Sequence, residues 1–396
     1  MMGLMQRISV LVDFTQIPLS RTGVGVYADH LVTNLLPLLR KDDLLTLVVQ
    51  SDDLLIRAAV NGYANVHLVT IPSKFFRNRA LLMIYEQLVL PIVAWAKRAN
   101  LIHSLHYTHP LLSLTRRVVT IHDLTFLLFP ELHTRSRRIV MPFFIRRAMK
   151  HADAVIFVSK ATQDDAERLI GTGHNLRRVV PLGVAACPPA QQGDPSSETY
   201  LSGIGVQQPY LLFVGTLEPR KNIVRIVNAF ESVAETHPEL TLVLAGKLGW
   251  HTDEIISAIE HSPMRPRIRY LGFVSEAQKR TLLRNCAMLV YPSLYEGFGL
   301  PVLEGMAAGA PVITSNLSSM PEVAGDAAVF VDPTSSDAIA AAIGKILRDV
   351  ILATRLQKAG PAQASLFTWG RTATLTLDLY RDARCTDHEP SRSAFE

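Results

Sequence analysis

Short apolar runs alternate with longer amphipathic stretches along almost the whole chain. In the first half the apolar runs cover residues 7–12, Leu45–Val49, Val66–Ile71, Leu101–Ser104, Val118–Ile121 and Ala154–Val158. In the second half they cover Tyr210–Val214, Leu240–Ala245, Ile268–Leu271 and Ala287–Pro292. Continuous apolar runs separated by helical patterns are typical of parallel sheets with crossover helices. The pattern therefore predicts an α/β protein with two doubly wound domains.

The boundary between the two domains is expected in a stretch rich in Pro, Gly, Ser and Gln. At 396 residues the chain is long enough for two or three domains. We predict a first domain over residues 1–184, a linker over 185–208 and a second domain over 209–368. A last helix is expected over 369–384, followed by a tail over 385–396.

The most informative stretch is Tyr295–Ser315, with the sequence YEGFGLPVLEGMAAGAPVITS. It follows an apolar run and predicts a Gly-rich loop, a helix that begins at Pro301 and a stop at Gly309. Glu296 in the loop and Glu304 in the helix can both face the space beyond the carboxyl end of the strand, where open α/β sheets bind ligands. The alternative is an ordinary strand-to-helix connection with a capping glutamate.

Two further loops have the composition of phosphate-binding loops. In GTLEPRKN, Gly215 turns the chain, and Arg220 and Lys221 bring two cations to one place, which suits a diphosphate. In RTGVG, Gly23 and Gly25 form a glycine turn between the first strand and the first helix. The alternatives are an ordinary basic loop and a simple tight turn.

One histidine lies at the end of a predicted strand, where an active-site residue is expected. His122 directly follows the run Val118–Ile121, so it belongs at the carboxyl end of the sheet. This position favours an active-site role, and the alternative is a polar residue bonded to backbone. Asp123 is expected to brace the loop, and Ser159 is expected to cap a helix.

Metal chemistry has little support in the sequence. His103, His106 and His109 lie close together in IHSLHYTHP, but that loop ends in proline and contains no acidic residue. We expect a loop at the mouth of a cleft there, with a zinc site as the alternative. The chain contains no D-x-D triplet, so the sequence predicts neither a metal nor a cofactor.

The string E-G-F-G-L-P-x-x-E, followed by a small-residue helix and G-x-P-V-I, resembles the donor-site element of the retaining glycosyltransferases of family 4. Those enzymes have two Rossmann-like domains that face each other across a cleft (the GT-B fold), and they use nucleotide-sugars. The strings VDFTQIPLSRTGVGVYADHL, HSLHYTHP, VVTIHDLTFLLFPE and FVGTLEPRKN look most like the bacterial mannosyltransferases of O-antigen and exopolysaccharide assembly. The resemblance covers residues 7–384 and implies that the last helix crosses back to the first domain.

The resemblance also implies a role for each motif residue. The diphosphate would be held by Gly23, Gly25, Gly215, Arg220 and Lys221, the ribose by Glu304, and the base by the backbone around Phe273 and Val274. The transferred sugar would be held by Glu296, His122 and the backbone N–H groups of Gly297, Phe298, Gly299 and Leu300.

We therefore expect a retaining, metal-independent transferase that moves a hexose, mannose from GDP-mannose, onto a glycan or a lipid-linked oligosaccharide. The family is usually assigned departure and attack on one face of the sugar, which requires no protein nucleophile. The alternatives are a UDP-glucose or UDP-GlcNAc transferase, an epimerase, a sucrose or trehalose synthase-like enzyme, and a non-catalytic partner protein. The intact motif residues argue against the last.

The charge of the chain is concentrated in one segment. The formal net charge is +5, and residues 131–151 contain Arg135, Arg137, Arg138, Arg146, Arg147 and Lys150 against Glu131 alone. Aromatic and apolar residues interleave with these bases, so the segment Arg135–Lys150 fits an anionic membrane surface, and a solvated helix face is the alternative. A second, weaker basic-aromatic cluster runs over residues 74–79. No recognised nucleic-acid motif accompanies the charge.

The remaining composition bears on location. The apolar run near the start ends at Asp13 and is expected to be a strand and not a signal peptide, and Leu81–Ala96 is interrupted by polar residues and proline. Cys187, Cys286 and Cys385 lie far apart, which suggests a reducing compartment without disulfides. We expect a cytoplasmic protein, peripheral on the inner face of the cytoplasmic membrane.

Overall fold

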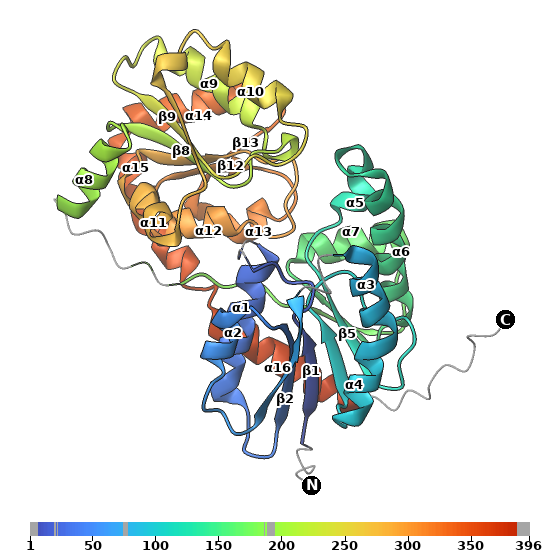
Figure 1. The fold of residues 1–396 in the computed structure, drawn as a ribbon. Coiled ribbons are helices and arrows are strands. Elements are labelled where there is room, and N and C mark those ends of the chain that lie inside the picture. Colours follow the sequence, from blue (N-terminus) through green and yellow to red (C-terminus); the bar gives the residue numbers. More distant parts are fainter. Residues whose placement is uncertain are drawn as a thin grey trace.

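The computed structural model describes residues 7–19, 21, 23–73, 78–185, 187 and 195–385. They form two α/β halves, one below the other in Figure 1. Each half has one sheet in which every strand pairing is parallel, with helices packed around it. The predicted α/β architecture with two doubly wound sheets is confirmed.

The first half is built on a seven-stranded sheet in the order β3-β2-β1-β4-β5-β6-β7. Its strands are β1 (Ser9–Asp13), β2 (Leu44–Gln50), β3 (Val66–Ile71), β4 (Leu101–Ser104), β5 (Arg116–Ile121), β6 (Ala154–Phe157) and β7 (Leu176–Val179). Its helices are α1 (Val24–Leu35), α2 (Leu54–Ala59), α3 (Arg79–Ile84), α4 (Leu90–Ala96), α5 (Thr125–Leu128), α6 (Arg135–His151) and α7 (Lys160–Ile170), with short turns η1 (Leu36–Leu38) and η4 (Pro130–Leu132) and a π-helical turn η3 (Tyr85–Val89).

The second half repeats the same plan with six strands, in the order β10-β9-β8-β11-β12-β13. Its strands are β8 (Tyr210–Val214), β9 (Thr241–Ala245), β10 (Ile268–Gly272), β11 (Met288–Tyr291), β12 (Val312–Ser315) and β13 (Val329–Val331). Its helices are α9 (Ile223–Ala234), α10 (Asp253–Glu260), α11 (Glu276–Asn285), α12 (Leu300–Ala307), α13 (Met320–Ala324), α14 (Ser336–Arg348) and α15 (Val350–Ala364), with short turns η5 (Pro219–Lys221), η6 (Arg265–Arg267) and η7 (Gly325–Ala327).

In both sheets the strand order reverses beside the first strand of that half, β1 or β8. Such switch points are where open α/β sheets leave a crevice at the carboxyl ends of their strands.

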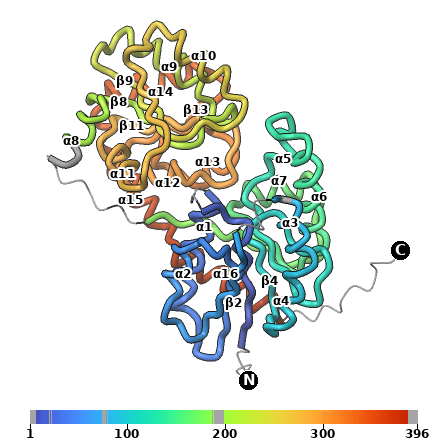
Figure 2. Tube along the Cα trace, in the orientation of Figure 1, coloured from blue at the N-terminus to red at the C-terminus, as the bar shows by residue number. Residues whose placement is uncertain are grey.

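The last helix, α16 (Trp369–Cys385), runs back from the second half and packs against α1, β5 and β6 of the first half (Figure 2). The imidazole of His103 fastens it: one ring nitrogen lies 2.6 Å from the hydroxyl of Tyr380 and the other 2.8 Å from that of Thr120. Burial lowers the pKa of His103 to about 3, so this histidine is neutral.

The expectation that the three histidines form a loop at the mouth of a cleft is wrong for two of them. His103 lies inside strand β4 and is fully buried, and His109 is also fully buried, 5.6 Å from the ring of Phe144. Both side chains are excluded from water, His103 by the elements packed on β4 and His109 by its contact with Phe144 of α6.

The stretch expected as a linker contains a helix of its own, α8 (Pro195–Gly203), and residues 186 and 188–194 lie outside the described part of the chain. Just before it, Gly183 passes so close to α16 that an added Cβ would lie 2.2 Å from the backbone nitrogen of Trp369. Only glycine permits so close an approach. The segment at Gly183 and the segment that leads into α16 both connect the halves, and they lie together at this point.

The two halves also touch across the cleft between their sheets. An added Cβ on Gly297 would lie 1.7 Å from the carbonyl oxygen of His122. The hydroxyl of Thr162 donates to the carbonyl of Gly297 at 3.0 Å. At the start of α7, the carboxylate of Glu322 accepts the backbone N–H of Lys160 at 2.8 Å. A carboxylate at a helix N-terminus is favoured by the helix dipole.

Glu322→Ala should therefore shift the molecule towards a more open arrangement of the two halves. Losing a carboxylate at a helix N-terminus costs about 1 kcal/mol, or roughly a fivefold change in the ratio of closed to open forms. Distances between spin labels on the two halves would measure the shift. Asp326→Ala, an exposed acid on the same segment, is the matched control, and equal distances in both variants would show that Glu322 does not hold the halves together.

Candidate active site

The site is built where the loops after β8, β9 and β11 meet. Gly215 ends β8 with φ of +148°, and an added Cβ on Gly246, which ends β9, would lie 1.8 Å from the carbonyl oxygen of Gly215. The following loop turns at Asn222, whose φ is +67° and whose amide donates to the carbonyls of Pro292 (3.0 Å) and Pro333 (2.6 Å). These bonds fix the loop that carries Arg220 and Lys221.

Both cations of that loop converge on one carboxylate. Arg220 lies 2.9 Å from one oxygen of Glu296, and the ammonium of Lys221 forms an ion pair with the other. Lys221 also donates to the hydroxyl of Tyr291 at 2.7 Å, and that hydroxyl donates to Glu296 at 3.1 Å. Glu218 accepts from Arg220 at 2.6 Å. The structure thus brings Glu296 to two adjacent cations, of which Lys221 lies 75 positions earlier in the sequence.

The protonation states of this cluster follow from its burial and its charges. Burial acts to raise the pKa of Glu296, but the charges of Arg220 and Lys221 outweigh it and lower this pKa to about 2. Burial also acts against the charge of Arg220, but Glu296 and Glu218 outweigh it and raise the pKa of that guanidinium. Glu296 and Arg220 are therefore ionised at neutral pH, in a place where water screens them little.

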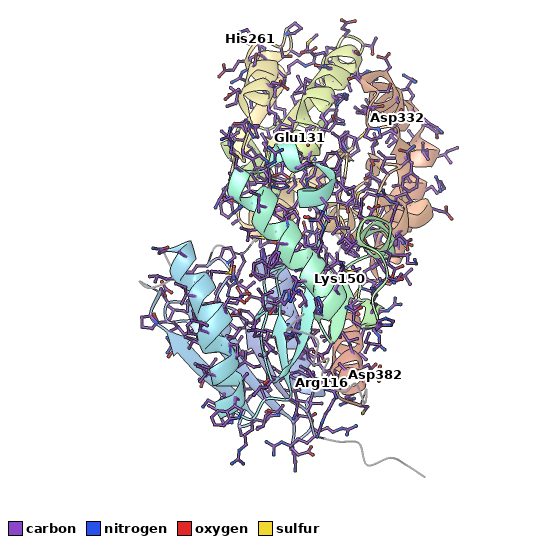
Figure 3. All side chains as sticks on the ribbon, turned by 90° about the vertical axis from the view of Figure 1, so that its right-hand side faces the viewer. Arg116, Glu131, Lys150, His261, Asp332 and Asp382 are labelled. Carbon is purple, nitrogen blue, oxygen red and sulfur yellow. The ribbon has the colours of Figure 1, made fainter. Side chains whose placement is uncertain are left out.

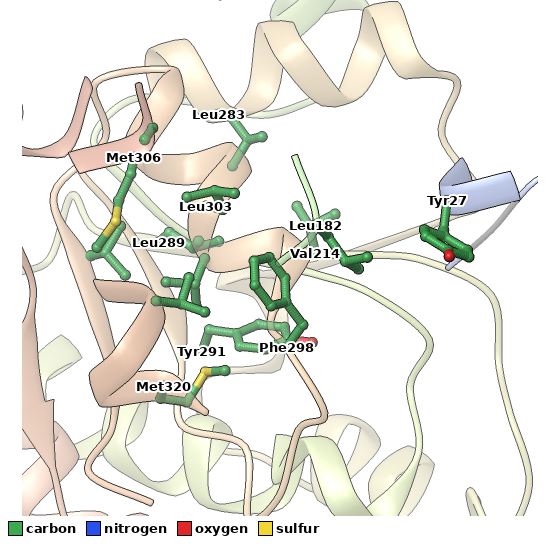
Figure 4. Packing of buried hydrophobic residues seen from close by; sticks show 14 of the residues in the cluster. Tyr27, Leu182, Val214, Leu283, Leu289, Tyr291, Phe298, Leu303, Met306 and Met320 are labelled. Atoms are coloured by element: carbon green, nitrogen blue, oxygen red, sulfur yellow. The ribbon is translucent and has the colours of Figure 1, made fainter. Parts of the chain in front are cut away.

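The Gly-rich loop after β11 leads directly into α12. Gly299 has φ of +107° and precedes the helix, Pro301 lies in its first turn, and Gly309 has φ of +78° just after its end, as predicted. Ser319 holds the loop by donating to the carbonyls of Glu296 (2.9 Å) and Phe298 (2.8 Å). Phe298, Met320 and Tyr291 form the apolar floor beneath it (Figure 4). The N-terminus of α12 is thereby aimed at the cleft.

The second carboxylate, Glu304, lies on a different wall. It forms an ion pair with Lys279 of α11 at 2.7 Å and lines a cavity of about 300 Å³. Burial raises the pKa of Glu304 although the charge of Lys279 opposes the rise. The cavity also reaches Arg21 and His30 of the first half, so it lies between the halves. Its size, and its mostly apolar lining with a few charged side chains, are those of a small-molecule site.

A second cavity, of about 150 Å³, lies beside Arg220 of the ion cluster. Arg220 lines it, together with residues that were not identified from the sequence: Tyr107, Thr125, Phe126, Leu132, His133, Arg137 and Trp250. Asp123 also lines it and braces the loop as predicted, accepting the hydroxyl of Thr125 at 2.8 Å. His133 and Trp250 face each other from the two halves with ring centroids 6.1 Å apart. The position of Trp250 beyond the carboxyl end of β9 was the one sequence signal that could have identified it as a site residue.

His122 follows β5 as predicted and belongs to the wall between the halves. Its Nε2 lies 2.9 Å from the carbonyl oxygen of Leu105, which can only accept, so Nε2 carries the proton. Burial lowers the pKa of His122, so the ring is neutral and Nδ1 keeps its lone pair. Such a histidine can accept a hydrogen bond from a sugar hydroxyl.

The other predicted ligand residues are placed less centrally. Gly23, with φ of +48°, precedes α1, and a Cβ on Gly25 would lie 3.0 Å from the side chain of Arg21, whose guanidinium bonds Asp29 and Asp53. Phe273 is 61% exposed, with the ammonium of Lys247 4.7 Å from its ring centroid, and Val274 is half-buried. Neither of the two cavities is lined by Phe273 or Val274.

Among the described residues, no three His, Cys, Asp or Glu side chains come together in a way that could hold a metal ion. The positive charges opposite Glu296 are supplied by side chains of the protein.

The buried carboxylate should make stability depend on acid. Because the pKa of Glu296 falls from 4.5 to about 2 on folding, its stabilisation is present above pH 4.5 and is lost as the pH falls towards 2. We expect it to contribute a loss of about 2 kcal/mol between pH 6 and pH 3. Urea unfolding of the wild type and of Glu296→Gln at both pH values measures the difference. An equal slope with pH in both proteins would contradict the ion cluster.

Comparisons with known proteins identify the families of the two halves. Residues 202–363 match the family described as "Glycosyl transferases group 1", and residues 21–186 match "Glycosyltransferase Family 4". Together these two matches include every strand of both sheets except β1.

Relatives and solved structures point the same way. The chain is 33% identical over 320 residues, 78% of its length, to the O-antigen chain mannosyltransferase B of Escherichia coli, of which it covers 82%. Over 85% of its length it is 23% identical to O-antigen chain mannosyltransferase RfbU of Salmonella typhimurium, of which it covers 90%. Its fold is that of a sucrose-phosphate synthase from Thermosynechococcus elongatus, with a TM-score of 0.74 and 19% identity over 95% of this chain and 99% of that one.

Two parallel sheets of matching strand order, a site between them, and these matches lead to one conclusion: the chain belongs to the family 4 glycosyltransferases and is a glycosyltransferase of the GT-B fold.

Proposed function

We propose that this protein is a retaining, metal-independent mannosyltransferase that moves mannose from GDP-mannose onto a glycan or lipid-linked oligosaccharide. The observation that carries the proposal is the buried cluster of Glu296, Arg220 and Lys221, whose Arg220 also lines the smaller of the two cavities. The choice of mannose is supported by the 33% identity to the O-antigen chain mannosyltransferase B.

In this account, donor binding exchanges the partners of the ion cluster. The diphosphate takes the guanidinium of Arg220 and the ammonium of Lys221, because two oxyanions compete with one carboxylate for these donors. Glu296 is then released to accept hydrogen bonds from hydroxyls of the transferred sugar. Since Glu296 remains ionised over the physiological range of pH, it can accept but not donate.

The two cavities would receive different parts of the two substrates. The cavity at Glu304 receives the nucleoside, with the carboxylate accepting from the ribose hydroxyls and Lys279 as its partner when the site is empty of nucleotide. Phe273 and Val274, which do not line this cavity, would contact the base from outside it. The cavity at His133 and Trp250 lies on the acceptor side. His122, with Nδ1 as an acceptor, orients the sugar between them.

The transfer itself needs no protein nucleophile. The bond from the anomeric carbon to the phosphate oxygen breaks, the acceptor oxygen forms its bond on the same face, and the acceptor proton passes to the departing phosphate oxygen. Arg220, Lys221 and the N-terminus of α12 stabilise the negative charge of the leaving diphosphate. Contact between Gly297 and His122 closes the cleft and keeps water from the anomeric carbon.

We propose a cytoplasmic location, peripheral on the membrane, with the segment Arg135–Lys150 in contact with anionic lipid. In the described residues, no helix is long and apolar enough to cross a bilayer, and the three cysteines are free thiols. Of the apolar residues that interleave with these bases, Phe144 and Ile145 are buried, because one side of α6 packs on the core. Phe143 is 48% exposed.

A competition series tests the donor. GDP-mannose should support transfer, and GDP should inhibit it at concentrations at least tenfold lower than UDP or ADP, since a correctly paired base is worth about 1–3 kcal/mol. Activity should survive exhaustive dialysis against EDTA. Preference for a UDP-sugar would overturn the mannose assignment, and complete loss in EDTA with recovery on adding Mg²⁺ or Mn²⁺ would overturn the metal-free account.

The two glutamates should fail in different ways. Glu304→Ala removes the acceptor for the ribose hydroxyls, so the affinity for GDP should fall about ten- to a hundredfold. Glu296→Ala removes a competitor for the two cations, so GDP binding should not weaken, while binding of the intact donor and the transfer rate fall by a similar factor. Calorimetry with GDP and with GDP-mannose separates the two. Equal losses of GDP affinity would show that the roles are wrongly divided.

A further inference from the structure

The segment α3–η3–α4 carries its apolar residues on the outside. Leu81, Ile84, Leu88, Ile92 and Trp95 are 44%, 52%, 63%, 62% and 69% exposed, and their spacing of three and four residues places them along one side. We call these five residues the outer apolar stripe. From Ala80 to Ala96 the only ionisable side chains are Tyr85 and Glu86. An uncharged, exposed stripe of this kind marks an interaction surface.

A wide helical turn keeps the outer apolar stripe facing outwards. Residues Tyr85–Val89 form a π-helical turn directly before Pro91, which cannot donate a helical hydrogen bond. On the inner side Glu86, Leu90 and Ala94 are fully buried. Glu86 accepts from the hydroxyl of Thr108 at 2.9 Å, and burial raises its pKa to about 8. The one acidic side chain of the segment is therefore turned away from the surface.

The stripe continues onto the loop between β4 and β5. The amide of Gln87 donates to the carbonyl of His109 at 2.9 Å and accepts the N–H of Leu111 at 2.9 Å, which pins that loop to the helix. Beyond the pinned residues, Leu112 and Leu114 are 75% and 98% exposed. Two leucines at a loop tip would be unfavourable in water unless something covers them.

Helix α6 adjoins the same loop from the other side. Arg117 donates to the carbonyl of Leu111 at 2.7 Å and to that of His151 at 2.6 Å, so it joins the loop to the end of α6. The exposed side of α6 carries a basic stripe, which consists of Arg135, Arg138, Arg146 and Lys150 and encloses the exposed side chains of Ile139 and Phe143. Figure 3 looks onto α6, with Glu131 before its start and Lys150 near its end, and shows α3–α4 beside it.

We infer that this face is a membrane-docking surface, in which the outer apolar stripe and the tip with Leu112 and Leu114 enter the lipid while the basic stripe contacts anionic headgroups. An uncharged apolar stripe bordered by cations has the composition of an interfacial helix, and tryptophan is favoured at that depth. A second copy of the chain fits less well, because a twofold contact centred here would bring the two basic stripes towards each other.

The role that we assign to the docking surface rests on the proposed function. Arg137, from the first turns of α6, lines the cavity on the acceptor side. A molecule lying on this face would have that cavity near the bilayer surface, where the sugar end of a lipid-linked acceptor is found. The docking surface would thus deliver the acceptor class that the site is proposed to use, and it adds nothing to the binding of the nucleotide.

The test uses the full chain and vesicles of phosphatidylethanolamine with or without phosphatidylglycerol. The double variant Leu88→Gln with Ile92→Gln should lower the vesicle partition coefficient about tenfold or more at every salt concentration, because the lost contact is apolar. Leu114→Gln should lower it independently from the loop. Arg138→Gln with Arg146→Gln should remove only the part of the binding that requires phosphatidylglycerol and falls with salt. These side chains are exposed, so the fold should survive.

The matched control is Val350→Gln with Ile351→Gln, which replaces side chains that are 73% and 84% exposed on α15 of the second half. It should bind vesicles as the wild type does. In addition, the fluorescence of Trp95 should shift to shorter wavelength on binding and be quenched by brominated lipid, and Trp95→Phe should abolish this signal.

The inference is overturned if Leu88→Gln with Ile92→Gln binds vesicles as tightly as the control Val350→Gln with Ile351→Gln. It is also overturned if the wild type binds neither kind of vesicle. A monomer-dimer equilibrium that Leu88→Gln with Ile92→Gln abolishes, without vesicle binding, would assign the face to a second copy. GDP binding, measured by calorimetry without lipid, should be unchanged in every variant, so a failure of the docking surface is distinct from a failure of the proposed function.

Discussion

The site depends on one buried carboxylate held between two cations. Glu296 is sequestered from water with Arg220 and Lys221 on either side, and neither the negative nor the positive charge would be tolerated there alone. Three features of the surrounding backbone hold these side chains together. They are the glycines at the ends of β8 and β9, the left-handed conformation of Asn222, and the hydrogen bonds of Ser319 to the Gly-rich loop. A diphosphate can replace Glu296 as the partner of Arg220 and Lys221, because it also carries negative charge.

The same constraint explains why both halves are needed. Gly297 has no room for a side chain because the carbonyl of His122 approaches it from the opposite half. Arg220 of the ion cluster lines the smaller cavity, and each of the two cavities is lined by residues from both halves. α16 and Gly183 carry the connections between the halves, so motion of one half against the other changes the distance between the donor wall and the acceptor wall without disturbing either sheet.

Much of this could be predicted from the sequence where the signal is local. Apolar runs mark the strands because buried parallel strands need no alternation, and Pro301, Gly309 and Ser159 mark helix ends because each satisfies or replaces a backbone hydrogen bond. The pairing of Glu296 with Lys221 was not predicted, since it depends on two loops brought together by the sheet. His103 was misread because nothing local shows that α16 covers it. The sequence of Leu81–Ala96 does not show which of its apolar side chains face solvent, because that depends on the π-helical turn at Tyr85–Val89.

The central claim is that Arg220 and Lys221 hold the diphosphate of the donor, and calorimetry of Lys221→Met tests it most directly. Methionine retains the length and packing of lysine without its charge. If the claim is correct, the affinity for GDP falls about a hundredfold, as expected for a lost charge-assisted contact at a buried site, while the affinity for guanosine, which has no phosphate, does not change. An unchanged affinity for GDP, or an equal loss for GDP and guanosine, would contradict the account.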